Sequence, residues 1–185
     1  MALYTGKGDG GTTKLFDTKS GERVSKHSIM FDALGTLDEL NTFVGWCRAG
    51  CAVDWRIGDS MMSALLLDVQ NRLFTAQAEL AGADKTIPLA DVKDIETTIA
   101  IIEGELPEIT TFLVPGGTEL SARLDIARTV ARRAERLLVG VHEGERKLSP
   151  HTLAYMNRLS SLLYALVRFV NERHEAIERP PEYAG

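Results

Sequence analysis

No apolar run in this 185-residue sequence reaches the roughly 18 residues that a membrane-spanning helix needs. The first residues also lack the apolar core of a secretory signal peptide. Lysine and arginine number 21 against 26 aspartates and glutamates, so the net charge of −5 provides no basic surplus for nucleic-acid phosphates. These absences predict a protein that spans no membrane, binds no nucleic acid and works in the cytoplasm.

Cysteine and histidine are too few and too scattered to form a recognisable metal site. The four histidines never form H-E-x-x-H or E-x-x-H, which excludes the zincin and di-iron bundle patterns. Cys47 and Cys51 are neighbours if they lie on one helix, but a lone C-x-x-x-C lacks a second pair of ligands. We therefore expect free thiols in a reducing compartment and no metal bound by protein side chains.

Helical periodicity is what the sequence does contain, from residue 28 onward. Apolar residues recur at intervals of three and four, the spacing of one face of a helix. Thr118 and Ser149 are expected N-caps, and Pro150 suits a first helical turn. The sequence predicts helices over 31–47, 58–81, 89–105, 119–141 and 149–173. With no strand–helix alternation, this indicates an all-α five-helix bundle.

The length fits a single domain over residues 1–185. We divide it into an N-terminal glycine-rich loop (1–27), the helical bundle (28–174) and a short tail (175–185).

The stretch "YTGKGDGGTTKLF", residues 4–16, contains G-x-G-x-x-G. No buried strand precedes it and no helix follows it, so it is not a dinucleotide fingerprint, and the order Thr-Thr-Lys does not fit a P-loop. One interpretation is a flexible arm. The other is an anion nest, in which glycines turn backbone amides toward one point, Thr and Lys add donors and charge, and Tyr4 and Phe16 anchor both ends.

"LDIARTVARRAERLL" places Arg128, Arg132 and Glu135 within roughly 60° of arc on one helix, at the border of its apolar face. Half-buried guanidiniums need a carboxylate or a phosphate as partner. Arg133 and Arg136 lie further round and fit a solvated face equally well.

Two more polar residues, Asp38 in "GTLDELN" and Asn157 in "YMNRLSSLL", are expected to point inward. Either can be part of the core structure, provided that it is hydrogen-bonded. Together with the glycine loop and the arginines, they indicate a polyphosphate site on a helical bundle.

Six motifs then stand in the order of one enzyme family: "YTGKGDGGTTKL", "RVSK", "ALGTLDELN", "FLVPGGTELS", "ARTVARRAERLL" and "YMNRLSSLL". With them, residues 4 to about 170 resemble the PduO-type ATP:cob(I)alamin adenosyltransferases. The resemblance implies a homotrimer of five-helix bundles with active sites between subunits. It also implies transfer of the 5′-deoxyadenosyl group of ATP to Co(I) of cobalamin, with release of triphosphate.

The resemblance further implies ATP as cosubstrate, cobalamin as substrate and Mg²⁺ held mainly by phosphate oxygens. A reductase and a cobalamin-dependent acceptor enzyme are the expected protein partners. The residues that match the family's ATP site are Thr5, Gly6, Lys7, Gly8, Thr13, Lys14, Lys26, Arg132, Arg133, Glu135, Arg136 and Asn157.

On the cobalamin side, Asp38 and Arg128 match an interhelical pair, and Phe112 matches the aromatic below the corrin ring. Because cobalt supplies the nucleophile, the protein needs no Ser, Cys or His nucleophile. Its task is to align Co(I) with the ribose 5′-carbon and to stabilise charge on the leaving triphosphate, to which Arg132 contributes. Without the resemblance, Phe112 in "TFLV" would be interpreted as an ordinary core residue.

Three positions depart from the family pattern. Gly6 stands where a basic residue is common, Ser161 where Asp is usual, and the tail offers Tyr183 without an obvious phenylalanine. These departures motivate a second hypothesis, a non-catalytic bundle that binds corrinoid or nucleotide and delivers it to another enzyme. A third is an interaction module without a ligand.

Overall fold

The computed structural model describes residues 3–183, so both ends of the predicted 1–185 domain lie outside the described residues. Five helices run through this part of the chain: α1 (Ile29–Ala49), α2 (Met62–Leu80), α3 (Leu89–Glu105), α4 (Glu119–Gly144) and α5 (Pro150–Arg173). Two short antiparallel hairpins complete it, β1 (Thr12–Thr13) with β2 (Val24–Ser25) and β3 (Arg56–Ile57) with β4 (Ser60–Met61). The predicted all-α five-helix bundle is confirmed.

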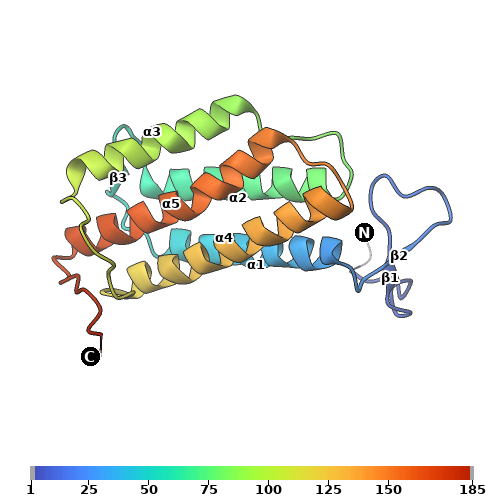
Figure 1. Cartoon of the computed structure of the whole chain (residues 1–185), viewed down its shortest axis with the longest axis horizontal. Coiled ribbons are helices and arrows are strands. Elements are labelled where there is room, and N and C mark those ends of the chain that lie inside the picture. Colours follow the sequence, from blue (N-terminus) through green and yellow to red (C-terminus); the bar gives the residue numbers. More distant parts are fainter. Residues whose placement is uncertain (1–2, 184–185) are drawn as a thin grey trace.

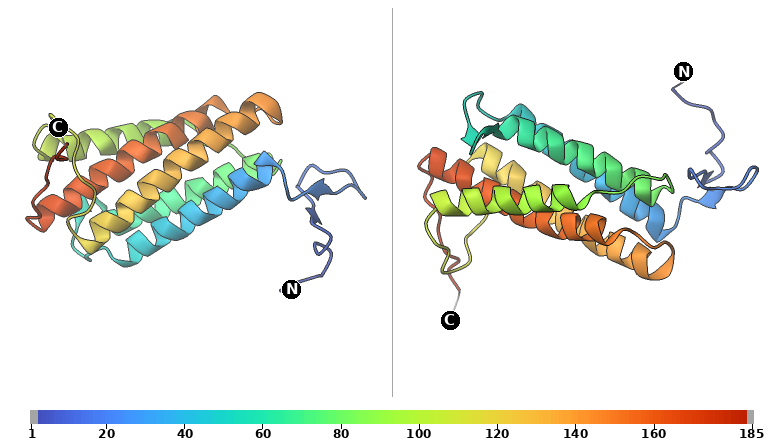
Figure 2. Two further views of the ribbon diagram at one scale, coloured as in Figure 1. Left: turned by 60° about the horizontal axis from the view of Figure 1, so that its bottom comes forward. Right: turned by 90° about the horizontal axis from the view of Figure 1, so that it is seen from above.

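The helices lie lengthwise beside one another (Figure 1). The bundle has α4 between α1 and α5, with α2 packed on α1 and α3 packed on α5. The β1–β2 hairpin projects beyond the end of the bundle where α1 begins and α4 ends. The α3–α4 loop (residues 106–118) and the C-terminal segment lie at the opposite end, as both views of Figure 2 show.

The apolar faces of all five helices meet in one core. The side chains of Leu37, Leu66, Leu124, Leu138 and Phe169 are almost completely buried there. Burial of a Leu or Phe side chain stabilises a fold by about 1.5–3 kcal/mol, so these faces dominate the stability of the bundle. None of the described helices is both long and apolar enough to cross a membrane.

The caps agree with the sequence. Thr118 and Ser121 form a reciprocal capping box at the start of α4, with Ser121 N donating to Thr118 Oγ1 at 3.1 Å. Ser149 precedes Pro150 and accepts a hydrogen bond from His151 N. Each cap satisfies amides that the first helical turn leaves free.

One predicted boundary is wrong. The expected helix over 58–81 begins only at Met62, because residues 56–61 form the β3–β4 hairpin. Gly58 occupies the left-handed region (φ +55°) at its turn, and a helix cannot pass through that conformation. The apolar periodicity continues through Met61 and Met62, so it does not reveal that α2 begins at Met62.

Both cysteines are free thiols. Cys47 is buried in α1, whereas Cys51 lies just past the helix and donates to Cys47 O at 3.5 Å. Burial raises the pKa of Cys47 to about 12 and that of Cys51 to about 11. Both therefore stay protonated and unreactive at neutral pH.

Candidate functional site

A large cavity, about 920 Å³, lies where the α3–α4 loop meets α4 and α5. Its lining consists of Ile109, Thr110, Thr111, Phe112, Leu113, Arg128, Arg132, Ser160, Ser161 and Tyr164. A second cavity of about 350 Å³ is lined by Arg132, Glu135, Arg136, Val139 and Asn157. Arg132 lines both cavities, so they meet at this residue, and together we call them the groove along α4 and α5. We call the first the loop cavity and the second the arginine cavity.

Phe112 is 80% exposed, so it is not a core residue. It belongs to the wall of the loop cavity, together with Tyr164 of α5. Burial raises the pKa of Tyr164, which keeps its hydroxyl neutral. An exposed aromatic ring beside a large cavity is typical of a surface for a flat apolar ligand.

Arg128 is partly buried and forms an ion pair with Asp125, one helical turn earlier, at 2.8 Å. Its guanidinium carbon also lies 5.8 Å from the centre of the Tyr164 ring. The structure does not bring Arg128 and Asp38 together within one chain. Asp38 is exposed on α1 and lines a separate cavity of about 390 Å³ with Glu39, among others.

The prediction that Asp38 points inward is therefore wrong. Leu37 and Leu40 occupy the buried face of α1, and Asp38 lies between them in sequence but on the exposed side. The sequence suggested a partner for Arg128 on another helix. The structure instead pairs it with Asp125, three residues earlier on α4.

Arg132, Arg133 and Arg136 are all exposed, so the expectation of a half-buried Arg132 is wrong. Arg133 forms an ion pair with Glu39 of α1, across the α1–α4 contact. Arg136 Nη1 donates to Arg132 O at 3.1 Å. Arg132 and Arg136, but not Arg133, line the arginine cavity, and their guanidinium groups suit a phosphate chain.

Asn157 is also exposed instead of inward, since the neighbouring Tyr155, Met156 and Leu159 take the buried face of α5. Its Nδ2 donates to Glu135 Oε1 at 2.6 Å, and its Oδ1 accepts from Arg158 Nη1 at 2.6 Å. A guanidinium only donates and a carboxylate only accepts, so these two partners fix the orientation of the amide.

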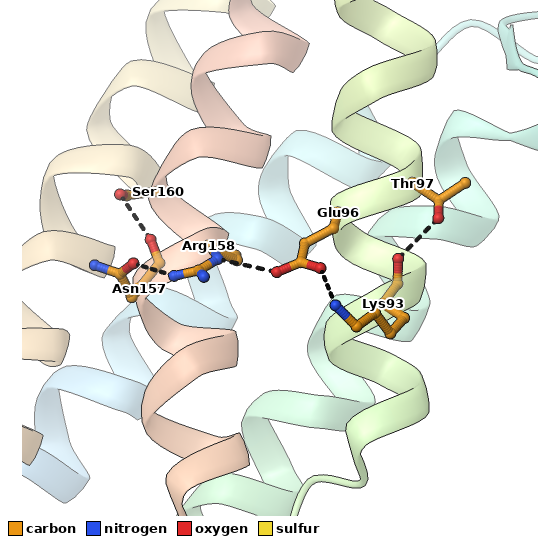
Figure 3. Close-up of polar contacts among 6 residues, drawn as sticks. All are labelled: Lys93, Glu96, Thr97, Asn157, Arg158 and Ser160. Atoms are coloured by element: carbon orange, nitrogen blue, oxygen red, sulfur yellow. Dashed lines mark hydrogen bonds and ion pairs between the residues drawn. The ribbon is translucent and has the colours of Figure 1, made fainter.

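Figure 3 shows how this contact continues to α3. Arg158 Nε donates to Glu96 Oε1 at 3.3 Å, and Lys93 Nζ donates to Glu96 Oε2 at 2.9 Å. Hydrogen bonds from Lys93 and Arg158 lower the pKa of Glu96, which keeps it charged. The sequence analysis did not identify Arg158 or Glu96. The position of Arg158, directly after Asn157, is the one signal that could have pointed to it.

The glycine-rich loop is built around the β1–β2 hairpin. Gly6 and Gly11 have φ of +66° and +74°, which turns the backbone back on itself. Lys26 directly follows β2. Its Nζ donates to Gly8 O at 3.1 Å, and its backbone amide donates to Gly11 O at 2.9 Å. The structure therefore brings the Lys26 side chain to the glycine-rich loop.

Of the remaining predicted loop residues, Thr5, Lys7 and Lys14 are exposed and Thr13 is half-buried. Sequence reasoning missed Arg23, which donates to Thr12 O at 2.6 Å and to Thr12 Oγ1 at 2.8 Å. The prediction that Tyr4 and Phe16 anchor the loop is wrong, because these side chains are 86% and 76% exposed.

The loop and the arginines remain apart within one chain. Over residues 3–183, no hydrogen bond or ion pair joins residues 3–14 to α4, and the hairpin stands beyond the end of the bundle (Figure 1). The predicted ATP residues therefore form two groups, one on the hairpin and one in the middle of α4 and α5.

Comparison with known proteins gives a consistent result. A family model described as cobalamin adenosyltransferase matches residues 3–170. The corrinoid adenosyltransferase of Bacillus subtilis is 37% identical over 177 residues, covering 94% of this chain and 88% of that protein. The corrinoid adenosyltransferase PduO of Citrobacter freundii is 39% identical over 183 residues, which are 95% of this chain but 51% of that protein.

Solved structures match as well. A variant of the PduO-type ATP:corrinoid adenosyltransferase from Lactobacillus reuteri, complexed with cobalamin and ATP, has a TM-score of 0.87 and 27% identity. The match covers 98% of this chain and 100% of that one. A second variant of the same protein, complexed with ATP, has a TM-score of 0.86.

Proposed function

Because this chain belongs to the cobalamin adenosyltransferase family, we propose that the groove along α4 and α5 is its active site. The chain is an ATP:corrinoid adenosyltransferase, which transfers the 5′-deoxyadenosyl group of ATP to the cobalt of cob(I)alamin. Adenosylcobalamin and triphosphate are the products. The observation that carries the placement is the junction at Arg132 between the arginine cavity and the loop cavity.

The groove suits the two substrates at its two ends. Arg132 and Arg136 supply donors and positive charge for the triphosphate, while Asn157 presents an amide whose orientation Glu135 and Arg158 fix. The loop cavity offers a larger volume and the Phe112 ring for the corrin. ATP therefore lies in the arginine cavity and cobalamin in the loop cavity, with the reacting atoms near Arg132.

The reaction is a displacement at the ribose 5′-carbon. Co(I) donates an electron pair, a Co–C bond forms, the C5′–O bond breaks, and both bonding electrons leave with triphosphate. The protein holds the two substrates in line and stabilises the charge that accumulates on the leaving group. Arginines perform the second task here, and Mg²⁺ held mainly by phosphate oxygens supplements them, since Mg²⁺ ordinarily keeps few protein ligands.

Phe112 acts on the cobalt from below. An apolar ring on the lower face of the corrin excludes a lower axial ligand and leaves the cobalt four-coordinate. Four-coordinate Co(II) accepts an electron more readily, which favours the Co(I) nucleophile. The electron itself comes from a separate reductase, and a cobalamin-dependent enzyme receives the product. The free thiols of Cys47 and Cys51 support a reducing, cytoplasmic location.

The complete site requires more than one chain. In this proposal the hairpin of one subunit, within the nucleotide-binding loop 1–27, closes over the arginines on the bundle (28–174) of its neighbour in a homotrimer. Exposed Tyr4 and Phe16 on the hairpin, and exposed Trp46 beside Asp38 on α1, are apolar surfaces that such contacts cover. Asp38 then reaches a neighbouring subunit's Arg128, which restores the interhelical pair that one chain lacks.

An anaerobic turnover assay tests the function. Chemically reduced cob(I)alamin is incubated with MgATP and the protein, and the product is identified by its absorbance before and after illumination. We expect a photolabile Co–C bond and one triphosphate released for each corrinoid consumed. Tight binding of both substrates without a Co–C bond would instead favour a delivery protein.

A further inference from the structure

The α3–α4 loop carries Phe112, yet it has no helix or strand of its own between residues 106 and 118. Phe112 is exposed and makes no core contact that would fix it. An aromatic ring can exclude a ligand from cobalt only if its backbone holds a constant position. The residues that hold this loop are therefore part of how the site works.

Hydrogen bonds to α4, α5 and the C-terminal chain hold the loop, and one of them runs from Ser121 Oγ of α4 to Gly116 O at 3.2 Å. Val114 N donates to Arg179 O of the C-terminal segment (residues 174–183) at 2.8 Å. Gly116 O accepts from Asn171 Nδ2 of α5 at 3.2 Å. Figure 2 shows the C-terminal segment and this loop at the same end of the bundle. The loop is thus tied to the last turn of α5 and to the chain that follows it.

The contact with Asn171 leaves no spare room. Asn171 is 3% exposed, and a Cβ placed on Gly117 would come within 2.5 Å of Asn171 Oδ1. Gly116 and Gly117 also have φ of +116° and +118°, which only glycine adopts readily. The Pro-Gly-Gly turn of the loop is therefore seated directly on the Asn171 amide.

Glu178 connects these contacts. Its Oε1 accepts from Asn171 Nδ2 at 3.2 Å, and its Oε2 accepts from Arg168 Nε at 3.2 Å. The Asn171 amide has two hydrogens, so one serves Glu178 while the other serves Gly116. Arg168 is 8% exposed, so Glu178 also provides the negative charge that a buried guanidinium requires.

These residues lie directly behind the loop cavity. Asn171 and Glu178 line a small cavity of about 30 Å³ together with Leu113, Arg128 and Tyr164. The last three residues also line the loop cavity. A change at Glu178 therefore reaches the wall of the corrin site through one layer of side chains.

We infer that Glu178 is a positioning residue for the corrin side of the reaction: it locks the Asn171 amide and the Val114–Arg179 backbone contact, and thereby fixes the loop that carries Phe112. This inference rests on the proposed role of Phe112 in the groove. Glu178 touches neither substrate. Removal of the Glu178 carboxylate frees the loop and lowers the fraction of bound corrinoid whose cobalt is four-coordinate. The arginine cavity is unchanged.

The test compares Glu178→Ala and Glu178→Gln with Glu182→Ala, an exposed glutamate of the same segment. Glu178→Gln keeps an acceptor for Asn171 but removes the charge opposite Arg168, so its effects should be smaller. The first measurement needs no activity: amide hydrogen exchange at Val114 should become about tenfold faster in Glu178→Ala, as expected for loss of one charge-assisted hydrogen bond.

The second measurement separates positioning from general stability. In Glu178→Ala we expect kcat to fall about tenfold, with the KM for ATP unchanged, and a smaller four-coordinate Co(II) fraction per bound corrinoid in absorbance spectra. Glu182→Ala should match the wild type throughout. The inference would be overturned if the amide of Val114 exchanged in Glu178→Ala at the wild-type rate. It would also be overturned if kcat and the KM for ATP changed by equal factors.

The two proposals fail in different ways. A wild-type protein that forms no Co–C bond removes the proposed placement of the active site, whatever the exchange data give. Faster exchange at Val114 with an unchanged kcat and an unchanged four-coordinate fraction would instead overturn the positioning role alone. If Glu178→Ala does not fold, Glu178→Gln decides by the same three measurements.

Discussion

Trans-complementation between two impaired variants tests whether the active site is shared between the subunits of the proposed homotrimer. Lys14→Ala removes a cation from the hairpin, and Arg132→Ala removes the guanidinium at the junction of the two cavities. Each variant alone should have a strongly raised KM for ATP, because every site in it lacks one phosphate contact. The informative measurement comes from trimers that contain both variants.

The expected activity follows from the arrangement of the two groups. If the hairpin of one subunit serves the arginines of the next around a ring, every mixed trimer contains three ordered pairs of hairpin and bundle. One of the three pairs joins an intact Lys14 to an intact Arg132, whether the trimer has two copies of one variant or two of the other. Mixed trimers should therefore show about one third of wild-type activity at limiting ATP.

The assay uses co-expression with two affinity tags and isolation of doubly tagged protein, followed by anaerobic turnover. Doubly tagged wild-type trimers provide the reference for any effect of the tags. A site built within one chain gives a different result, because every chain then carries a defect and no site is intact. Activity no higher than that of the separate variants would refute the shared site.

Three further predictions concern single chains. Phe112→Ala should lower kcat with the KM for ATP kept within about twofold, and an unchanged kcat at saturating cob(I)alamin would contradict the four-coordinate argument. Arg158→Met should raise the KM for ATP about threefold to tenfold by releasing the Asn157 amide. Arg173 lies on the same helix and has a similar exposure, and Arg173→Met should leave the KM for ATP unchanged. Equal effects of the two substitutions on this KM would argue against the role of Arg158. Glu79→Gln should lower the free energy of unfolding by about 2 kcal/mol, because the buried Glu79 carboxylate accepts two hydrogen bonds at the start of α5; urea denaturation measures this, and a change below about 0.5 kcal/mol would contradict it.

The sequence predicts the bundle well because helical periodicity is a local property. The 119–141 helix, for example, has a capping threonine, a long apolar face and no internal breaker, and α4 indeed starts at Glu119. The start of α2 was missed because the hairpin at Gly58 depends on backbone conformation in a stretch whose apolar pattern already looks helical.

The candidate site was less accessible to sequence reasoning. Asp38 and Asn157 have apolar neighbours in sequence, but a helix turns them by about 100° per residue away from those neighbours and into solvent. Tyr4 and Phe16 were expected to anchor a loop within its own chain, whereas both side chains are exposed. Positioning residues such as Glu178 and Arg158 carry no motif of their own, since their effect depends on which side chains they contact.

In the proposed site, a single helix, α4, sets the spacing between the two substrates. Arg128 lies at the loop cavity and Arg136 at the arginine cavity, eight residues apart, which at 1.5 Å per residue is about 12 Å along the axis of α4. The capping box at Thr118 joins the first turn of this helix directly to the loop that carries Phe112. In the proposed site, the backbone of α4 therefore sets the distance between the residues that support the corrin and those that contact the triphosphate. For a reaction whose nucleophile and leaving group both belong to the substrates, such alignment is one of the main contributions that a protein scaffold can make. It also explains why contacts that hold the two ends of α4, and not only residues that touch a substrate, should affect turnover.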